Sequence, residues 1–97
     1  MRFQGAVILG KVAVSFKIMP SDETKDLSKI EKGLKADLSK EFALGKSSIE
    51  ELAFGIKVLK IIVIMSDEGG LVDSVEQRIR SFSDVGEVEV EEVSLIS

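Results

Sequence analysis

The chain has 97 residues, of which 17 are acidic and 13 are basic, and it contains no histidine and no cysteine. This length supports one hydrophobic core and one domain. Without histidine or cysteine there is no Ser-His-Asp or Cys-His nucleophile, no imidazole or thiolate ligand for zinc, and no disulfide. The composition argues against covalent catalysis, and we predict no catalytic residue.

Charge is distributed unevenly along the chain. Residues 1–48 carry 9 basic and 6 acidic side chains, whereas residues 49–97 carry 4 basic and 11 acidic ones. A protein that binds nucleic acid needs a basic face to neutralise phosphates. Here the lysines between Lys25 and Lys46 alternate with acids, as on an ordinary solvated helix. The charge pattern predicts no direct contact with nucleic acid.

The apolar segments are too short to span a membrane. The most apolar run, 56–65, contains two lysines and has half of the ~20 residues that a spanning helix needs. Near the N-terminus, Lys11 interrupts a short apolar stretch, unlike the continuous core of a signal peptide. The sequence predicts a cytoplasmic protein without membrane contact.

The first predicted element is a strand that begins after Gly10. Its apolar and polar residues alternate, as in a strand with one buried face. The apolar side comprises Val12, Val14, Phe16 and Ile18. We expect the strand to end at Met19-Pro20, because proline cannot donate to a sheet ladder.

A helix follows the first strand. Its apolar residues recur at spacings of three and four, at Leu27, Ile30, Leu34, Leu38 and Phe42. We expect Asp26 to cap the helix, with Ser28 and Glu31 as a competing capping box. Gly45 is the predicted stop. Gly33, in mid-helix, suggests a close crossing of the sheet.

The second half of the chain repeats the alternation of strand and helix. Residues 48–54 form a short strand candidate, with Gly55 as a break or bulge, and 56–65 form the next strand. Residues 61–65 are apolar on both faces, which is typical of a central strand. A second amphipathic helix runs from Leu71 or Val72 to Phe82.

The last strand is acidic and ends the chain. Val88 and Val90 alternate with glutamates, which suits an edge of a sheet. The alternation then slips by one residue to Val93 and Leu95, so we expect a bulge near Glu91–Glu92.

The order of elements is therefore β-α-β-β-α-β. Two split βαβ units with right-handed crossovers give an α+β, ferredoxin-like sandwich, with a four-stranded antiparallel sheet and both helices on one face. We expect residues 10–97 to form this single domain and residues 1–9 to be an N-terminal extension of unknown order. The fold hosts many functions and does not identify one.

Phe54 permits two interpretations. It lies at the predicted end of a short edge strand, between the small residues Ala53 and Gly55. Most phenylalanines fill a core, and Phe54 could do so here. Alternatively, Phe54 projects as an aromatic anchor, the kind of residue that dominates protein interfaces.

The C-terminus is unusual because it is apolar. Leu95 and Ile96 close a strand that has no basic residue after Arg80, where a frayed polar tail is common. These side chains either dock on the domain's own core or enter a groove on a partner.

The remaining glycine and acidic motifs do not indicate a phosphate-binding or a metal-binding site. Gly69-Gly70 precedes a helix but lacks the spacing and the lysine of a phosphate-binding loop. Asp67, Glu68 and Asp73 lack the spacing of a calcium loop. We predict no cofactor-binding and no metal-binding residues.

Four segments, 14–20, 22–24, 52–60 and 67–70, together resemble the elongation factor 1-beta family. The most specific element is the Ala-Phe-Gly-Ile-Lys-x-Leu run at 53–59, followed by an apolar strand. The chain is similar in particular to the small archaeal type, which consists only of the guanine-nucleotide exchange domain of the elongation factor 1-beta/delta family. The resemblance covers about residues 10–97.

The resemblance implies a ferredoxin-like fold and a factor that promotes GDP/GTP exchange on elongation factor 1-alpha, the GTPase that delivers aminoacyl-tRNA. Such a factor binds the GTPase in its GDP-bound and nucleotide-free states. The resemblance implies that Ala53, Phe54 and Gly55 contact the second domain of the GTPase. It also implies that Leu95, Ile96 and Ser97 reach towards the Mg²⁺ and phosphate region.

Two departures from the family pattern concern the mechanism. Many members carry Lys or Arg just before the last apolar residue, and Leu95 takes that place when Ile96 is aligned with the apolar residue. Leu95 cannot act by charge, so the end works sterically, exchange is weaker, or another cation such as Lys57 or Lys60 contributes. The usual proline before the Ala-Phe-Gly run is also replaced, by Glu51-Leu52.

Two alternatives remain at this stage. One is a regulatory module of the ACT type, which has the same fold and binds a small ligand between subunits paired edge to edge. The glutamates from Glu87 to Glu92 argue against such pairing, because like charges would face each other, and we expect a monomer. The other is a degenerate family member that binds the GTPase with weak exchange.

Overall fold

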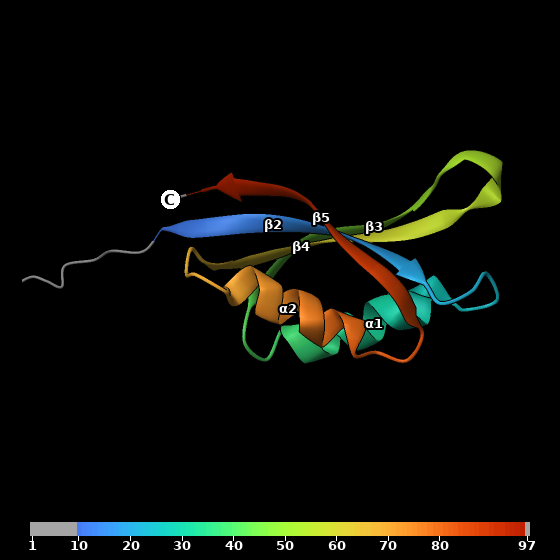
Figure 1. Ribbon diagram of the computed structural model, residues 1–97, viewed down its shortest axis with the longest axis horizontal. Helices are drawn as coiled ribbons and strands as arrows, with labels where there is room; N and C mark the ends of the chain where they lie inside the picture. The colour runs from blue at the N-terminus through green and yellow to red at the C-terminus, as the bar shows by residue number, and fades with distance from the viewer. Residues whose placement is uncertain (1–9, 97) are drawn as a thin grey trace, which may run out of the picture.

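The computed structural model describes residues 10–96, arranged as shown in Figure 1. The elements in chain order are β2 (Lys11–Pro20), α1 (Leu27–Leu38), β3 (Ala43–Glu51), a single 3-10 turn η1 (Ala53–Gly55), β4 (Lys57–Ser66), α2 (Leu71–Arg80) and β5 (Val85–Leu95). The predicted extension, residues 1–9, and Ser97 lie outside the described residues. Apart from the short 3-10 turn, the order is the predicted βαββαβ.

The four strands form one antiparallel sheet in the order β3-β4-β2-β5. Both helices lie on one face of this sheet, and the opposite face is open (Figure 1). Two split βαβ units produce this arrangement. The predicted ferredoxin-like sandwich is confirmed, with β4 in the centre and β5 at an edge.

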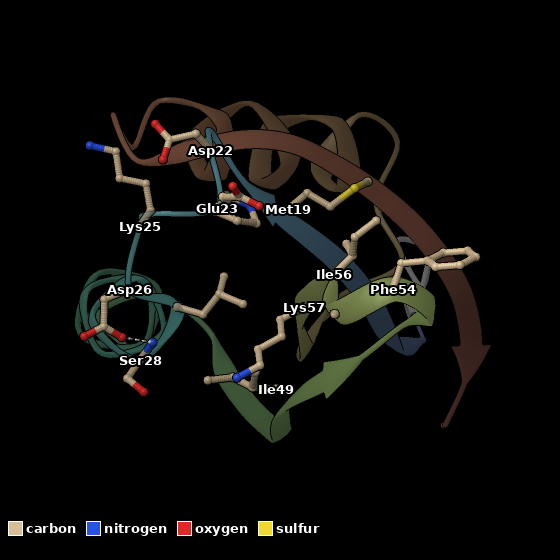
Figure 2. Close-up of a pocket in the computed structure, with 13 residues that line it drawn as sticks. Met19, Asp22, Glu23, Lys25, Asp26, Ser28, Ile49, Phe54, Ile56 and Lys57 are labelled. Atoms are coloured by element: carbon tan, nitrogen blue, oxygen red, sulfur yellow. Dashed lines mark hydrogen bonds between the residues drawn. The ribbon is translucent and has the colours of Figure 1, made fainter.

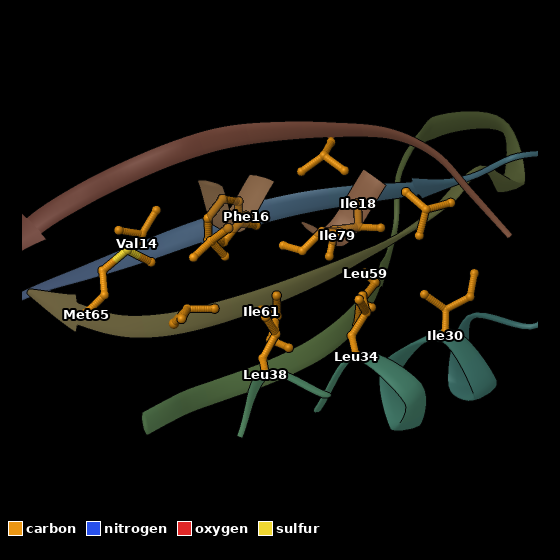
Figure 3. Packing of buried hydrophobic residues seen from close by; sticks show 14 of the residues in the cluster. Val14, Phe16, Ile18, Ile30, Leu34, Leu38, Leu59, Ile61, Met65 and Ile79 are labelled. Atoms are coloured by element: carbon orange, nitrogen blue, oxygen red, sulfur yellow. The ribbon is translucent and has the colours of Figure 1, made fainter. Parts of the chain in front are cut away.

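The hydrophobic core lies between the sheet and the two helices (Figure 3). The alternation of β2 places its predicted apolar residues there, and each is at most 4% exposed. The four predicted apolar residues within α1 face them, together with Val75 and Ile79 of α2. Burial of each large side chain contributes about 1.5–3 kcal/mol, so these faces fix how the helices lie on the sheet.

Helix α1 begins as predicted but ends earlier. The carboxylate of Asp26 accepts a hydrogen bond from the Ser28 N–H at 2.9 Å, which confirms Asp26 as the cap. Gly45 is not the stop, because the helix ends at Leu38 and Gly45 lies within β3. Phe42 packs against the core from the connecting loop rather than from the helix. The end was predicted too late because the four-residue spacing of apolar residues extends to Phe42, beyond the last residue of the helix.

The two glycines of this region serve close packing. A Cβ atom on Gly45 would lie 3.0 Å from Cγ2 of Ile62, so the glycine lets β3 approach β4 beside a break in their register. Gly33 does not mark a close crossing of the sheet as predicted. A Cβ atom there would lie 3.2 Å from Cε2 of Phe82, which follows α2, so Gly33 instead admits the aromatic ring.

The strand predicted at 48–54 was wrong in both bounds. Strand β3 begins five residues earlier, at Ala43, and ends at Glu51. It is an edge strand and lies half exposed, so its sequence lacks the strong alternation of β2. Residues 53–55 form the turn η1 instead of continuing the strand.

The predicted bulge in the last strand is confirmed. Phe16 pairs with Val90, whereas the preceding Ser15 pairs with Glu92, so Glu91 is the extra residue. A bulge bends its strand and increases the local twist. In Figure 1, β5 bends along its length at the edge of the sheet.

Gly86 is expected to be intolerant of even a methyl group. A Cβ atom there would lie 2.7 Å from the carbonyl oxygen of Pro20 and 2.8 Å from the Cα atom of Ser21. Both contacts are with backbone at the paired ends of β2 and β5, which cannot yield without loss of pairing. We expect Gly86→Ala to lower the free energy of unfolding by about 1–2 kcal/mol. Urea denaturation would measure this change, with Gly69→Ala, at an open position, as the control.

Arg78 of α2 joins the two helices. Its Nε donates to Oδ2 of Asp37 in α1 at 2.8 Å, and its Nη1 donates to Oε1 of Glu41 at 2.6 Å. A further contact joins Nη2 to Oδ1 of Asp37 at 3.2 Å, which makes the pair bidentate. The hydrogen bond from Arg78 lowers the pKa of Asp37 below its ordinary value of 3.8.

The Arg78–Asp37 pair is expected to make stability sensitive to acid. Because the pKa of Asp37 is lower in the folded state, its contribution is fully present above about pH 4 and is lost as the pH falls through the folded value. We expect Asp37→Asn to reduce the loss of stability between about pH 5 and about pH 2. Urea denaturation across this range would test it. An acid dependence equal to that of the unaltered protein would contradict the role of Asp37.

Candidate partner-binding site

The hairpin tip, residues 52–56, connects β3 to β4. The Leu52 N–H donates to the Ile56 carbonyl at 2.6 Å and closes the tip, and the Ile56 N–H donates to Ala53 at 3.4 Å. Phe54 has φ 63° and ψ 30°, and Gly55 has φ 76°. A left-handed backbone is rare for a bulky residue and costs on the order of 1–3 kcal/mol. The fold therefore holds Phe54 in a strained conformation at the end of a hairpin.

Phe54 is 99% exposed, so the interpretation that it fills the core is wrong. Ala53 and Gly55 are exposed on either side of it. Leu52, 40% exposed, and Ile56, 55% exposed, extend the apolar surface. Such exposed apolar groups are typical of an interaction site.

A cleft of about 640 Å³ lies beside the hairpin tip (Figure 2). Its apolar lining includes Met19, Ile49 and Ile56, and Phe54 stands at its margin with the ring pointing away from Ile49. The loop after β2 supplies charged residues of both signs to its rim, including Asp22, Glu23 and Lys25. The cleft enlarges the apolar surface around Phe54, and sequence patterns gave no sign of it because it joins two distant loops.

Asp22 is fixed in the loop after β2. Its Oδ1 accepts hydrogen bonds from the hydroxyl and, at 2.8 Å, from the N–H of Thr24. These hydrogen bonds lower the pKa of Asp22. Across residues 10–96, the structure brings no three acidic side chains together in a way that could hold a metal ion.

The end of β5 carries the second group of predicted residues. Leu95 is 69% exposed and Ile96 is 52% exposed, so their docking on the domain's own core is not observed. The Ile96 N–H donates to the Lys11 carbonyl at 2.9 Å, which keeps the end paired with the first residue of β2. Ser97 lies outside the described residues.

The structure does not bring the two groups of predicted residues together. Leu95 pairs with Val12, and Val12 pairs with Met65 near the end of β4. The hairpin tip precedes Lys57, at the start of the same strand. At about 3.3 Å per residue, Lys57 and Met65 are about 26 Å apart. Figure 1 shows the hairpin and the C-terminus at opposite ends of the sheet.

The two lysines considered as substitutes for a cation at Leu95 do not lie at the end of β5. Lys57 follows the hairpin tip, at the opposite end of the sheet. The Nζ of Lys60 lies 3.3 Å from a carboxylate oxygen of Glu50 and 3.3 Å from one of Glu91. Lys11, whose side chain is exposed, is the lysine beside Ile96. Sequence reasoning missed it because the neighbourhood arises from pairing of the first and last strands.

Comparison with known proteins identifies the family. The EF-1 guanine nucleotide exchange domain matches residues 13–96. The chain belongs to this family. Elongation factor 1-beta of Thermoplasma acidophilum is 35% identical over 88 residues, covering 91% of this chain and 100% of the relative. That of Thermococcus gammatolerans is 40% identical over 81 residues, covering 82% of this chain and 89% of the relative. This member of the exchange family therefore functions in guanine nucleotide exchange during translation elongation.

A solved structure shares the fold of this exchange-family member. The ACT domain from the GTP pyrophosphokinase of Chlorobium tepidum has a TM-score of 0.60 at 13% identity, covering 84% of this chain and 99% of that chain. At this identity the likeness shows the fold alone. The ACT-like interpretation is not favoured, because the exchange domain matches nearly the whole chain in sequence. Among residues 10–96, neither helix has the length and apolar character needed to cross a membrane.

Proposed function

We propose that this protein accelerates GDP release from elongation factor 1-alpha through two contacts, one at Phe54 and one at the end of β5. The observation that carries the proposal is the 99% exposure of Phe54 in a left-handed backbone conformation. A strained and unburied aromatic residue stabilises neither the core nor the hairpin. Binding of a partner would bury it and recover the hydrophobic free energy that folding leaves unused.

The two contacts have different roles in the proposed mechanism. Ala53, Phe54 and Gly55 anchor the protein on the GTPase in both its GDP-bound and its nucleotide-free state. The chain end, with Leu95, Ile96 and Ser97, acts at the nucleotide site. An exchange factor accelerates release only if it binds the nucleotide-free state more tightly than the GDP-bound state. The chain end provides this difference by disturbing the coordination of Mg²⁺ and phosphates, since the ion bridges protein and nucleotide.

Lys11 supplies the positive charge of the proposed chain end. The end of β5 follows a run of glutamates and would meet the negative charge of a nucleotide. Leu95 cannot offset this repulsion, but the exposed Lys11 lies beside Ile96 on the adjacent strand. A cation there favours approach to phosphates and competes with Mg²⁺.

Residues 10–97 form the proposed exchange domain. The domain acts in the cytoplasm, and it works by binding the GTPase rather than by covalent catalysis. It contacts neither nucleic acid nor a membrane. The glutamates along the edge strand β5 oppose pairing with a second copy, so the protein works as a monomer. Light scattering tests this state, and a stable dimer would contradict it.

Release of labelled GDP tests the proposed function directly. Elongation factor 1-alpha loaded with labelled GDP is mixed with excess unlabelled GDP, with and without this protein. We expect the release rate to rise with the protein concentration and to saturate. An unchanged release rate would refute the proposal, and a protein that still bound the GTPase without faster release would be a degenerate family member.

A further inference from the structure

Lys60 links both edges of the sheet across its open face. It projects from β4, whereas Glu50 lies on β3 and Glu91 on β5, and β2 separates β4 from β5. Its Nζ nevertheless lies 3.3 Å from Oε1 of each glutamate. The hydrogen bonds that the Lys60 ammonium donates, first to Glu91 and then to Glu50, raise the pKa of Lys60. The ammonium group is therefore held between two strands that are not neighbours.

The bulge makes this link possible. Glu91 is the extra residue of β5, inserted between the pairs Phe16–Val90 and Ser15–Glu92. Its carboxylate meets Lys60 and is fixed, with a side chain 31% exposed. Lys17 of β2 lies directly opposite Lys60 in the ladder. Its Nζ lies 3.7 Å from Oε2 of Glu89, a residue of β5 that precedes the bulge. The two lysines thus hold β5 at different points, and only Lys60 holds the bulge.

The direction of the chain end depends on the bulge. As an edge strand, β5 has β2 as its single neighbour, and only four paired residues, from Glu92 to Leu95, follow Glu91. Bulges bend strands and re-aim the side chains beyond them. A side chain that fixes the bulge therefore also fixes where Leu95 and Ile96 lie.

We propose that Lys60 and Glu91 are positioning residues for nucleotide exchange, which hold the bulge of β5 and so aim the chain end at the nucleotide site of the GTPase. This inference rests on the proposed function. Glu50 contributes to the same positioning, because it lies on β3, the strand that leads into the hairpin tip. One ammonium group thereby fixes the two contact points relative to each other. Once Phe54 is bound, this pre-organised spacing lowers the entropic cost of bringing the chain end to the nucleotide site.

Hydrogen exchange on the protein alone provides the first test. The Ile96 amide, bonded to the Lys11 carbonyl at 2.9 Å, reports on the chain end. We expect this amide to exchange about fivefold faster in Lys60→Met and in Glu91→Gln. A change of about fivefold corresponds to the upper end of the free energies measured for partly exposed ion pairs. Lys60→Arg retains the charge and should restore the original rate. The matched controls Lys17→Met and Glu92→Gln should leave the rate unchanged.

GDP release from elongation factor 1-alpha provides the second test. In Lys60→Met we expect the maximal release rate to fall about fivefold, while the half-saturating concentration changes less than about twofold, because Phe54 still anchors the complex. Lys60→Arg should recover the rate. A uniform loss of stability would not produce this division between maximal rate and half-saturation.

The outcomes separate the inference from the proposed function. If the unaltered protein accelerates release but Lys60→Met behaves like it in both tests, the positioning role is refuted and the proposed function stands. Equal effects from Lys17→Met would also refute the positioning role, since loss of any lysine on the open face would then slow exchange. If the unaltered protein does not accelerate release, the proposed function fails, and the role of Lys60 and Glu91 in exchange fails with it.

Discussion

Replacement of Phe54 with alanine is expected to weaken binding to elongation factor 1-alpha about a hundredfold while leaving the free energy of unfolding unchanged. Truncation of a central aromatic anchor costs about 2–4 kcal/mol at protein interfaces. The free protein loses nothing comparable, because Phe54 is 99% exposed and makes no core contact. This separation between binding and stability distinguishes an anchor from a structural residue.

Titration calorimetry with the GTPase and urea denaturation of the free protein would measure the two effects of Phe54→Ala. Val90→Ala is a matched control, because it truncates an apolar side chain that is 37% exposed on β5, away from the hairpin tip. We expect it to change the dissociation constant less than about threefold, as for a residue outside an interface hot spot. Normal binding by Phe54→Ala would remove the anchor from the proposed mechanism.

Reversal of the charge at Lys11 is expected to slow GDP release about tenfold at saturating protein. A change of two charge units about 10 Å from nucleotide phosphates, at an intermediate effective dielectric, is worth about 1–2 kcal/mol. Lys11→Glu would place a negative charge beside the end of β5 and oppose its approach to the nucleotide site. Binding through Phe54 would persist, because the two contacts lie about 26 Å apart along the sheet.

A compensating substitution makes the test of Lys11 specific. Leu95→Lys in the Lys11→Glu background returns a cation to the end of β5, so we expect the release rate to recover. Lys46→Glu is the matched control, since Lys46 is an exposed lysine on β3, at the opposite edge of the sheet. If Lys11→Glu releases GDP at the original rate, the chain end acts sterically rather than by charge.

The strand and helix order could be predicted from sequence because hydrophobic periodicity is a local signal. Alternation through Phe16 identified β2, and the slip between Val90 and Val93 identified the bulge at Glu91. Asp26 was recognisable as a cap because capping depends on residues two positions apart. The end of α1 and the start of β3 were missed, since Phe42 and Gly45 serve packing with distant residues.

Hydrophobic periodicity and local motifs were sufficient to predict the fold class, the family and the candidate residues, including Phe54 and Leu95. Whether those side chains are buried or exposed became known only from the folded arrangement of the chain. Burial depends on which segments cover a position, and no local pattern around Phe54 encodes the turn that lifts it out of the sheet. The same holds for Lys11 beside Ile96 and for Lys60 beside Glu91, because strand pairing brings together residues that are far apart in the chain.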